Sequence, residues 1–242
     1  GHEIVDAMTE ADAILSDLDD KITKDLISSA PKLKIIANYA VGYDNIDLVA
    51  AKERNIFVTN TPDVLTEAVA EHTVALILAI VRRISEADRY IRANKWHEPW
   101  RWNFMLGSEL KGRTLGIVGP GRIGSRVGQI AEQGFGMKVK YCGSKDSIDA
   151  FLPECDVVSI HVPLLDSTRH MLNEARLQVM KPTAYLINAA RGPVVDEAAL
   201  ARALKQGIIK GAAMDVFENE PNVHPELLIL ENVVLTPHIA SA

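Results

Sequence analysis

The chain has 242 residues, and its 26 basic and 32 acidic side chains give a net charge of −6. This length can bury a sizeable core as one large domain or two smaller ones, and the acidic balance argues against nucleic acid as a partner. The longest apolar run, residues 74–81, is too short to cross a bilayer, and the first residues lack a basic segment followed by an apolar one, so we expect no membrane association. Only Cys142 and Cys155 are present, which predicts no disulfide framework, no metal site and a reducing cytoplasm.

Residues 1–65 alternate short apolar runs with helical patterns, which is typical of an α/β fold. Gly42 follows the second apolar run, at the edge of a parallel sheet where ligands collect. A turn in which Asp44 or Asn45 caps the next helix explains the same residues. The pattern predicts strands over 13–15, 33–37 and 56–58, and helices near 24–29 and 46–53.

From Thr66 the pattern changes to that of one long helix, expected over residues 67–94. This helix has an apolar stripe and becomes amphipathic in its later part. Residues 96–102 follow it and hold all three tryptophans of the chain. Trp and Arg are enriched at interfaces, so this segment is a candidate interface or pocket lid. A loop anchored by its own aromatic side chains is the alternative. Helix and segment together offer more apolar surface than one nucleotide domain covers, which predicts a two-fold homodimer.

The apolar run 114–118 ends in three glycines spaced G-x-G-x-x-G, and a helical pattern follows. Gly119 allows a tight turn, Gly121 allows backbone to approach a pyrophosphate, and Gly124 allows the helix to pack closely on its strand. The helix N-terminus offers N–H groups and a positive dipole end to phosphates, and Arg122 can add a charge. A structural loop can have the same spacing, but the strand before it and the helix after it favour dinucleotide binding.

The second half of the chain continues the alternation. Asp196 is a plausible N-cap for one of its helices, and Gly207 terminates that helix. Residues 143–156 leave room for only one short helix. The pattern predicts strands over 138–142, 156–162, 184–188 and 212–216 and a last one from residue 232, with helices near 174–180 and 196–206.

Three residues that can carry chemistry on a 2-keto acid lie at the ends of these elements: Arg191, Glu220 and His238. A guanidinium matches a substrate carboxylate and stays charged. A histidine can give the carbonyl oxygen a proton as hydride arrives, and a carboxylate bonded to the imidazole would orient it and raise its pKa. Singly, each residue has an ordinary structural explanation, as a strand cap, a solvated carboxylate or a satisfied loop histidine. Their joint placement favours catalysis.

Six ordered phrases of the chain strongly resemble the D-isomer-specific 2-hydroxyacid dehydrogenases, and among these the glyoxylate/hydroxypyruvate reductases. The resemblance implies Arg191 as substrate clamp, His238 as acid/base and Glu220 as its partner. The phrases are Val-Gly-Tyr-Asp-Asn-Ile-Asp (41–47), Gly-Pro-Gly-Arg-Ile-Gly (119–124), His-Val-Pro-Leu (161–164), Asn-Ala-Ala-Arg-Gly-Pro-Val-Val-Asp (188–196), Met-Asp-Val-Phe-Glu-Asn-Glu-Pro (214–221) and Leu-Thr-Pro-His-Ile-Ala-Ser-Ala (235–242).

The same resemblance implies a fold and a set of ligand contacts. The fold would be a Rossmann-type doubly wound parallel sheet (67–238, including the long interdomain and dimerisation helix) plus a smaller, incomplete flavodoxin-like substrate domain (1–66), to which residues 239–242 begin to return. The amides around Val41 and Gly42 would bind the substrate carboxylate, and Asp215 would face the nicotinamide amide. The implied cofactor contacts are Gly119, Gly121, Arg122, Ile123, Gly124, Gly143, Ser144, Lys145, Val162, Pro163, Thr168, Ala189, Ala190, Arg191, Asp215, His238 and Ala240.

The chain departs from the family pattern at three places. The family has a strand and helix before the part matching Gly1, a returning helix after the part matching Ala242, and a helix, strand and helix where this chain has residues 143–156. Either the sequence omits segments that were disordered or removed, or the protein is a natural fragment, and we expect the former. A true loss near residue 145 would expose the sheet edge beside the adenosine site.

The leading hypothesis is therefore an enzyme that reduces glyoxylate or hydroxypyruvate with NAD(P)H. A nucleotide-responsive binding module, similar to corepressor relatives of this fold, is the alternative, and a dimeric structural role is a more distant one. For the cofactor, we expect NADP(H) in preference to NAD(H), because Gly143, Ser144 and Lys145 stand where NAD-specific members have a carboxylate. Asp146 would restore NAD preference if the loop folds back.

Overall fold

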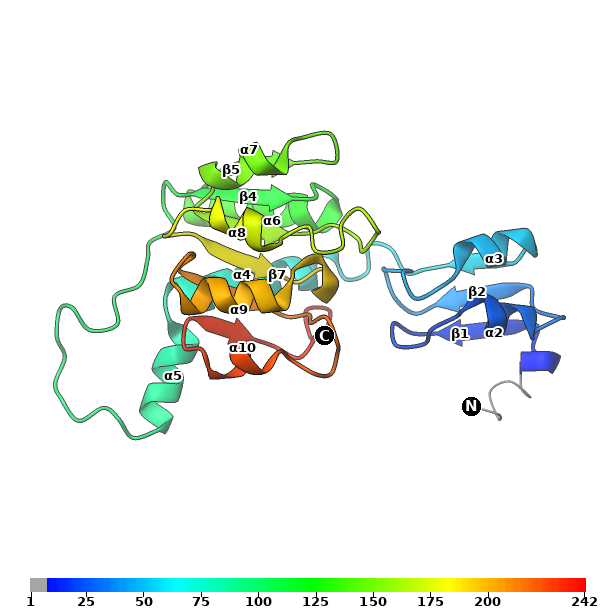
Figure 1. Cartoon of the computed structure of the whole chain (residues 1–242), viewed down its shortest axis with the longest axis horizontal. Coiled ribbons are helices and arrows are strands. Elements are labelled where there is room, and N and C mark those ends of the chain that lie inside the picture. The colour runs from blue at the N-terminus through cyan, green and yellow to red at the C-terminus, as the bar shows by residue number, and fades with distance from the viewer. Residues whose placement is uncertain (1–7) are drawn as a thin grey trace. The chain divides into compact units, whose positions relative to one another are not determined.

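The computed structural model describes residues 8–242 and divides the chain into two compact units, the first ending at Val64 and the second running over Leu65–Ala242 (Figure 1). Each unit is built on a parallel sheet with helices in the connections, so the predicted α/β class is confirmed. Parallel strands need such crossover connections, which explains why strand and helix patterns alternate along the chain.

The first unit has a three-stranded sheet of order β1-β2-β3. Ile14, Ile36 and Val58 occupy matching register positions and pack, with residues of the two helices, into one core. The helix after the Gly42 loop is capped by Asp47, whose carboxylate accepts the N–H of Ala50 at 2.9 Å, so the expected cap by Asp44 or Asn45 is wrong. The elements are β1 (Ala13–Ser16), α2 (Lys24–Ser28), β2 (Ile35–Asn38), α3 (Leu48–Glu53) and β3 (Phe57–Thr59).

The second unit has a six-stranded parallel sheet of order β5-β4-β6-β7-β8-β9. Its strands are β4 (Thr114–Val118), β5 (Lys138–Cys142), β6 (Val157–Ile160), β7 (Tyr185–Asn188), β8 (Gly211–Met214) and β9 (Val233–Leu235). Its helices are α4 (Thr66–Val81), α5 (Ile84–Arg92), α6 (Arg122–Phe135), α7 (Ile148–Phe151), α8 (Glu174–Gln178), α9 (Glu197–Lys205) and α10 (Pro225–Ile229), with short 3-10 turns at Leu152–Glu154 and Gly192–Val194.

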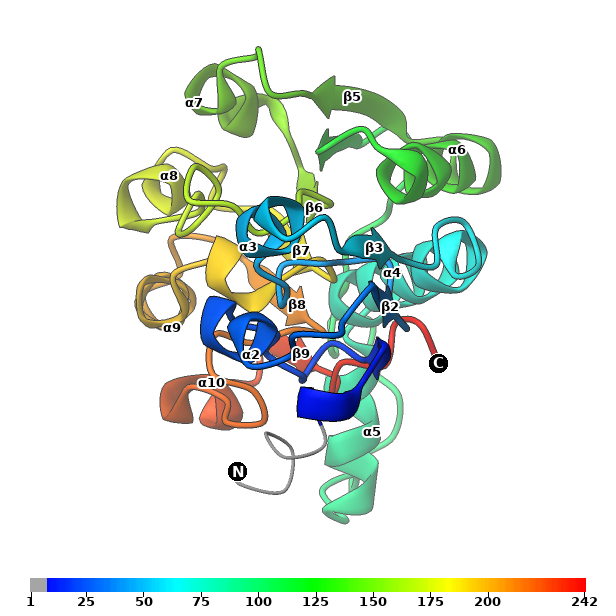
Figure 2. The same cartoon turned by 90° about the vertical axis from the view of Figure 1, so that its right-hand side faces the viewer.

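Helices cover both faces of this sheet: in Figure 2, α4 and α6 lie on one side, and α8, α9 and α10 on the other. The side chains of β4 divide accordingly, with Leu115 and Ile117 packed towards α4 and α6 and Val118 towards the opposite core. Because both faces are covered, β6, β7 and β8 are buried at every position, and most of their residues are apolar. The loops that follow these strands are therefore anchored to a fully buried part of the sheet.

The predicted helix over 67–94 is broken into α4 and α5, so that prediction is wrong. Arg83 has a left-handed backbone (φ 57°) at the break, and its guanidinium makes two hydrogen bonds with Glu86, at 2.6 and 2.7 Å. The carbonyl of Val81, which a continuous helix would pair with its own next turn, instead accepts the N–H of Ser108 at 2.8 Å. A contact distant in sequence thus ends α4, and local pattern could not reveal it.

Other details follow the sequence more closely. Asp196 caps α9 through the N–H of Ala199, and Gly207 follows that helix with φ 69°. Residues 143–156 hold only α7 and one 3-10 turn, as predicted, and β5 is the edge strand of its sheet. Helix α10 was not predicted, because it has five residues and begins at Pro225 after the uncommon cap His224. Within residues 8–242, no helix combines the length and the apolar character that crossing a bilayer requires.

Candidate active site

The glycine-rich turn joins β4 to α6 with the geometry that its spacing predicts. Gly119 has φ 92°, and a Cβ there would lie 2.7 Å from the carbonyl oxygen of His161. A Cβ on Gly124 would lie 2.5 Å from the carbonyl oxygen of Gly119, so the helix packs against its own turn. Only glycine fits at these two positions, because one needs the left-handed region and the other a close backbone approach.

Gly121 differs from its two neighbours in the motif. Its φ of −77° is open to any residue, and a Cβ built there would meet no atom within 4 Å. It is the N-cap of α6, where it has no side chain to bond the first helical N–H groups. An open space in front of a helix N-terminus suits a phosphate, so this turn fits the pyrophosphate of a dinucleotide.

The loop after β6 lies against this turn. Val162 is close to Gly119, and a Cβ on Gly119 would come within 2.9 Å of its side chain. Thr168 is buried, and its hydroxyl donates to the carbonyl of Pro163 at 2.7 Å and accepts the N–H of Leu165 at 2.8 Å. One hydrogen-bonded loop beside the glycine turn thus contains the predicted residues Val162, Pro163 and Thr168.

His161, the residue before Val162, was not predicted as a site residue. Its Nε2 lies 2.8 Å from the hydroxyl of Ser159, and burial lowers the pKa of its imidazole to about 4. The ring is therefore neutral at physiological pH. The backbone carbonyl of His161 lies against Gly119, so this residue packs behind the glycine turn.

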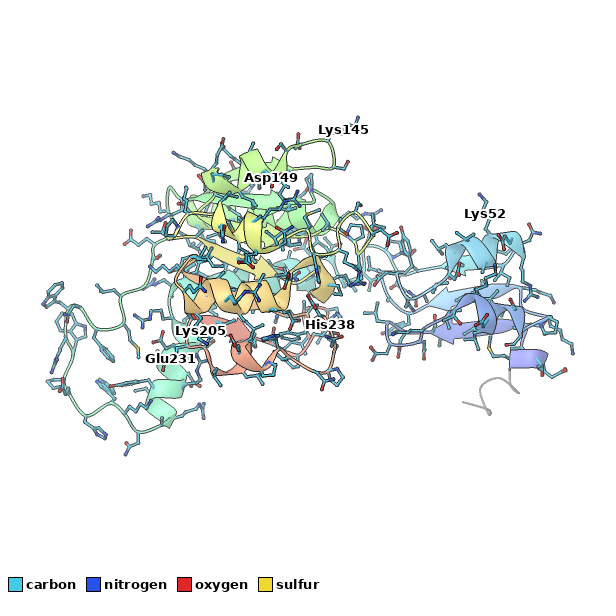
Figure 3. All side chains as sticks on the ribbon, in the orientation of Figure 1. Lys52, Lys145, Asp149, Lys205, Glu231 and His238 are labelled. Atoms are coloured by element: carbon cyan, nitrogen blue, oxygen red, sulfur yellow. The ribbon has the colours of Figure 1, made fainter. Side chains whose placement is uncertain are left out.

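The tip of β5 carries the residues expected to choose between cofactors. Ser144 and Lys145 are exposed, and Figure 3 shows Lys145 extended from the tip of this loop. The carboxylate of Asp146 folds back and accepts the N–H of Gly143 at 2.7 Å. A cation and a carboxylate thus both lie in this loop.

The catalytic candidates lie in the second unit, and Figure 3 shows His238 at the end of its parallel sheet. A hydrogen bond of 2.7 Å joins Nδ1 of His238 to Oε2 of Glu220. The other oxygen of Glu220 accepts the N–H of Phe217 at 2.8 Å. Arg191 follows β7, and its guanidinium is near enough to lower the pKa of both Glu220 and His238. The predicted trio is therefore one cluster.

The electrostatics of this cluster favour a protonated histidine. The hydrogen bond and charge of Glu220 raise the pKa of His238 above its ordinary value, against the opposing effects of burial and Arg191. Burial acts to raise the pKa of Glu220, but the bonds from His238 and Phe217 and the charge of Arg191 outweigh it, and the pKa of this carboxyl is lowered. The result is a carboxylate beside an imidazole whose pKa is raised, which favours the protonated form that an acid for reduction requires.

His238 is held in a strained conformation, with φ 52°, by the buried side chain of Asp215. One carboxylate oxygen of Asp215 accepts the hydroxyl of Thr236 at 2.5 Å and the N–H of Ile239 at 3.0 Å, and the other accepts the N–H of Ala240 at 2.9 Å. The backbone carbonyl of Asp215 also accepts the N–H of His238 at 2.8 Å. Asp215 was predicted only as a nicotinamide contact. In the structure it also supports the loop that carries His238.

A second buried carboxyl, Glu197, was not predicted. It is 4% exposed at the start of α9, and it accepts the backbone N–H groups of Glu218 and His224, on either side of Glu220. The signal in the sequence was an acidic residue directly after the Arg191 phrase, in the first turn of a capped helix. That position is also common for exposed glutamates, so the sequence did not single it out.

The remaining predicted positions are ordered as follows. In the first unit, the carbonyl of Val41 accepts the side-chain amide of Asn60 at 2.9 Å, and that of Gly42 accepts the amide of Asn38 at 2.6 Å, so the loop is held by its carbonyls. In the second unit, the N–H of Ala190 donates to Asn188 at 3.1 Å. Among residues 8–242, no group of three or more His, Cys, Asp or Glu side chains is arranged to hold a metal ion.

Comparison with known proteins agrees with this geometry. Residues 74–240 match the family model described as "D-isomer specific 2-hydroxyacid dehydrogenase, NAD binding domain". A glyoxylate reductase of Thermofilum pendens is 50% identical over 257 residues, which cover all of this chain and 75% of that protein.

Two solved structures are similar in both fold and sequence. A protein of Thermus thermophilus has a TM-score of 0.92 and 43% identity, over 99% of this chain and 79% of that one. The NADPH-dependent glyoxylate/hydroxypyruvate reductase of Sinorhizobium meliloti, solved in complex with NADP and malonate, has a TM-score of 0.89 and 37% identity, over 98% of this chain and 76% of that one. With the glycine turn, the carboxylate-supported histidine and these matches together, the chain belongs to the D-isomer specific 2-hydroxyacid dehydrogenases.

Proposed function

We propose that this protein is an NAD(P)-dependent oxidoreductase that reduces a small 2-keto acid, glyoxylate or hydroxypyruvate, to the D-2-hydroxy acid. The observation that carries the proposal is the 2.7 Å bond between His238 and Glu220, with the charge of Arg191 beside both. The glyoxylate reductase of Thermofilum pendens, 50% identical, supports the choice of substrate.

Each member of the trio has a defined task. The planar guanidinium of Arg191 binds the substrate carboxylate and polarises the neighbouring carbonyl. A nicotinamide, when bound, supplies the hydride that reaches the carbonyl carbon. His238 gives its proton to the carbonyl oxygen and becomes neutral, while Glu220 keeps the imidazole oriented through Nδ1. In the oxidation direction, neutral His238 takes the proton back from the hydroxyl.

We infer separate binding contacts in each of the two units. The glycine turn and the N-terminus of α6, in the second unit, are the candidates for the cofactor phosphates. In the first unit, the amides around Val41 and Gly42 are the candidates for the substrate carboxylate, because their loop is held through its carbonyl groups. NADPH is the proposed cofactor over NADH, because Ser144 and Lys145 follow β5, and the carboxylate of Asp146 is the group that opposes this choice.

A kinetic panel tests the function. Purified protein is given NADPH or NADH with glyoxylate, hydroxypyruvate, pyruvate or phenylpyruvate, and cofactor absorbance is followed. Arg191→Ala should lower kcat/KM by about a hundredfold, since a charged hydrogen-bonding partner of the substrate is lost. Arg202→Ala is the matched control, because Arg202 lies on α9 in an exposed pair with Glu174 and should leave the rate unchanged.

Two outcomes would overturn the assignment. Wild-type turnover in Arg191→Ala would remove the substrate clamp from the mechanism. Tight cofactor binding without turnover of any 2-keto acid would favour the nucleotide-responsive binding module, for which the exposed edge strand β5 and the short segment after it are the supporting observation.

We further propose that the protein is a two-fold homodimer. Trp96, Trp100 and Trp102 are 57%, 80% and 76% exposed, in a loop that swings away from the sheet of its own unit (Figure 1). Exposed tryptophans in such number mark a surface that another protein covers. The edge contact between Tyr90 and Phe104 favours the alternative, a loop anchored by its own aromatic side chains. Two free, buried cysteines fit the proposed location in a reducing cytoplasm.

A further inference from the structure

Glu220 sits in an irregular segment between β8 and α10, residues 217–224, most of which has no helix or strand to hold it. An exposed segment of this kind would ordinarily vary in position, and catalysis needs its carboxylate at one place. The start of the segment packs on the residue after Arg191, since a Cβ on Gly192 would lie 1.9 Å from the carbonyl carbon of Phe217. The rest of the segment needs another support.

Glu197 supplies that support from the first turn of α9. Its Oε1 accepts the N–H of Glu218, and its Oε2 accepts the N–H of His224 at 3.1 Å. In return, Oε1 of Glu218 accepts the N–H of Glu197 at 3.2 Å. One carboxylate thus bonds the backbone on both sides of Glu220.

The cost of burying this carboxyl indicates that the contact has a purpose beyond α9 itself. Burial raises the pKa of Glu197, which the bonds from Glu218 and His224 only partly offset. The helix does not need a buried acid at this position, because Asp196 already caps it through Ala199 at 2.8 Å. Burying a charge is costly, and α9 does not need this one. The buried carboxylate of Glu197 is therefore explained by the segment that it holds, residues 218–224.

We propose that Glu197 is a positioning residue of the acid–base pair, which holds residues 218–224 so that Glu220 stays against His238. The inference deepens the proposed function and rests on it for the role of His238. Glu197 itself is not assigned any contact with substrate or cofactor.

The following groups can influence the protonation of His238 and Glu197. His238 faces Glu220, Arg191 and Asp215. Glu197 faces Glu218 and His224, and Glu218 forms a 2.8 Å pair with His170.

Glu197→Gln tests the proposal with little change in shape. One end of the amide presents N–H to a backbone N–H, so one of the two bonds to the segment is lost. The pKa of His238, followed by NMR titration of its imidazole in cofactor-free protein, should fall. The kcat for reduction should drop about tenfold, and the fall of kcat with rising pH should begin at a lower pH than in the wild type. The KM for the cofactor should stay unchanged.

Two further variants separate positioning from general destabilisation. Asp196→Ala removes the cap of the same helix without touching residues 218–224, so it should lower the melting temperature and leave the titration of His238 unchanged. In Glu220→Gln protein, adding Glu197→Gln should shift that titration no further, because the group through which Glu197 acts has lost its charge. If Glu197→Gln does not fold, Glu197→Asp takes its place, since its shorter side chain keeps the charge and reaches only one amide.

Three results would overturn the proposal: an unchanged His238 titration in the folded Glu197 variant, an equal shift in Asp196→Ala, or additive shifts in the double variant. The NMR readout needs no turnover. If the wild type reduces no 2-keto acid, the proposed function fails, while the titrations still decide whether Glu197 positions Glu220.

Discussion

In the proposed mechanism, Glu220 sets the pH range over which His238 acts as an acid. Its bond and charge raise the pKa of His238, so reduction is retained as pH rises until the raised pKa is passed. Glu220→Gln removes the charge, and the pKa of His238 should fall. The reduction rate should then be lost at lower pH than in the wild type, and kcat near neutrality should drop at least tenfold.

The reverse reaction gives an internal check on this prediction, since oxidation needs neutral His238. In Glu220→Gln protein the rise of the oxidation rate with pH should therefore begin at lower pH. Steady-state rates in both directions across the pH range provide the measurement. Profiles that stay where the wild-type profiles lie would show that Glu220 does not act on His238.

Asp215 has a structural effect that can be measured separately from rate. Asp215→Asn turns one acceptor into a donor facing the N–H groups or hydroxyl of residues 236–240, and the loop loses at least one bond. We expect a loss of about 2 kcal/mol in the free energy of unfolding by urea, together with a lower kcat. Exposed Asp166→Asn is the control and should change neither. Equal stability of wild type and Asp215→Asn would contradict the assigned role.

At the scale of elements, substitutions of two glycines in the same turn should have different effects, one on stability and the other on cofactor binding. Gly119→Ala forces a side chain into φ 92° and against the carbonyl of His161, so stability should fall by about 2 kcal/mol. Gly121→Ala adds a methyl to open space at an ordinary φ, so the melting temperature should stay unchanged while the Kd for the reduced cofactor rises. Calorimetry and fluorescence titration measure the two effects. A Gly121→Ala protein that binds cofactor normally would exclude this turn as the phosphate site.

We expect the balance of two charges in the loop after β5 to decide the choice between NADPH and NADH. Lys145→Ala should weaken the preference for NADPH by about tenfold, as expected for one lost charged contact. Asp146→Asn should strengthen the same preference, because it removes the charge that lies at the tip of β5. The measurement is the ratio of kcat/KM for the two cofactors at fixed glyoxylate. A wild-type preference for NADH would refute the proposal and make Asp146 the ribose partner.

For the whole molecule, the tryptophan-rich loop predicts association. Sedimentation at micromolar concentration should give a dimer, and replacing both Trp100 and Trp102 by Ser should shift the equilibrium towards monomer, because most of each side chain is exposed in the single chain. Leu165→Ser removes an exposed apolar side chain elsewhere and is the control. A wild type that sediments only as monomer would count against the dimer.

Those features that depend on near neighbours in the chain were predictable from the sequence. The turn at Gly119 and the cap at Asp196 are examples, because backbone conformation and first-turn hydrogen bonds are set within a few residues. The alternation of strands and helices gave the parallel sheet for the same reason. The proximity of Arg191, Glu220 and His238 was predictable because each follows an element, and parallel strands bring such ends to one edge, whereas their catalytic roles remain predictions.

Only the tertiary structure decided which distant groups meet. The bond from Ser108 to Val81 breaks a helix that its own sequence pattern would continue. The carboxyl of Glu197 looks like an ordinary surface acid in the sequence, and that of Asp215 was predicted only as a cofactor contact. Both support loops of the candidate site because folding brings backbone N–H groups to them from residues far along the chain. Side-chain patterns carry information about local conformation and burial, whereas these hydrogen bonds depend on how the completed sheet arranges its loops.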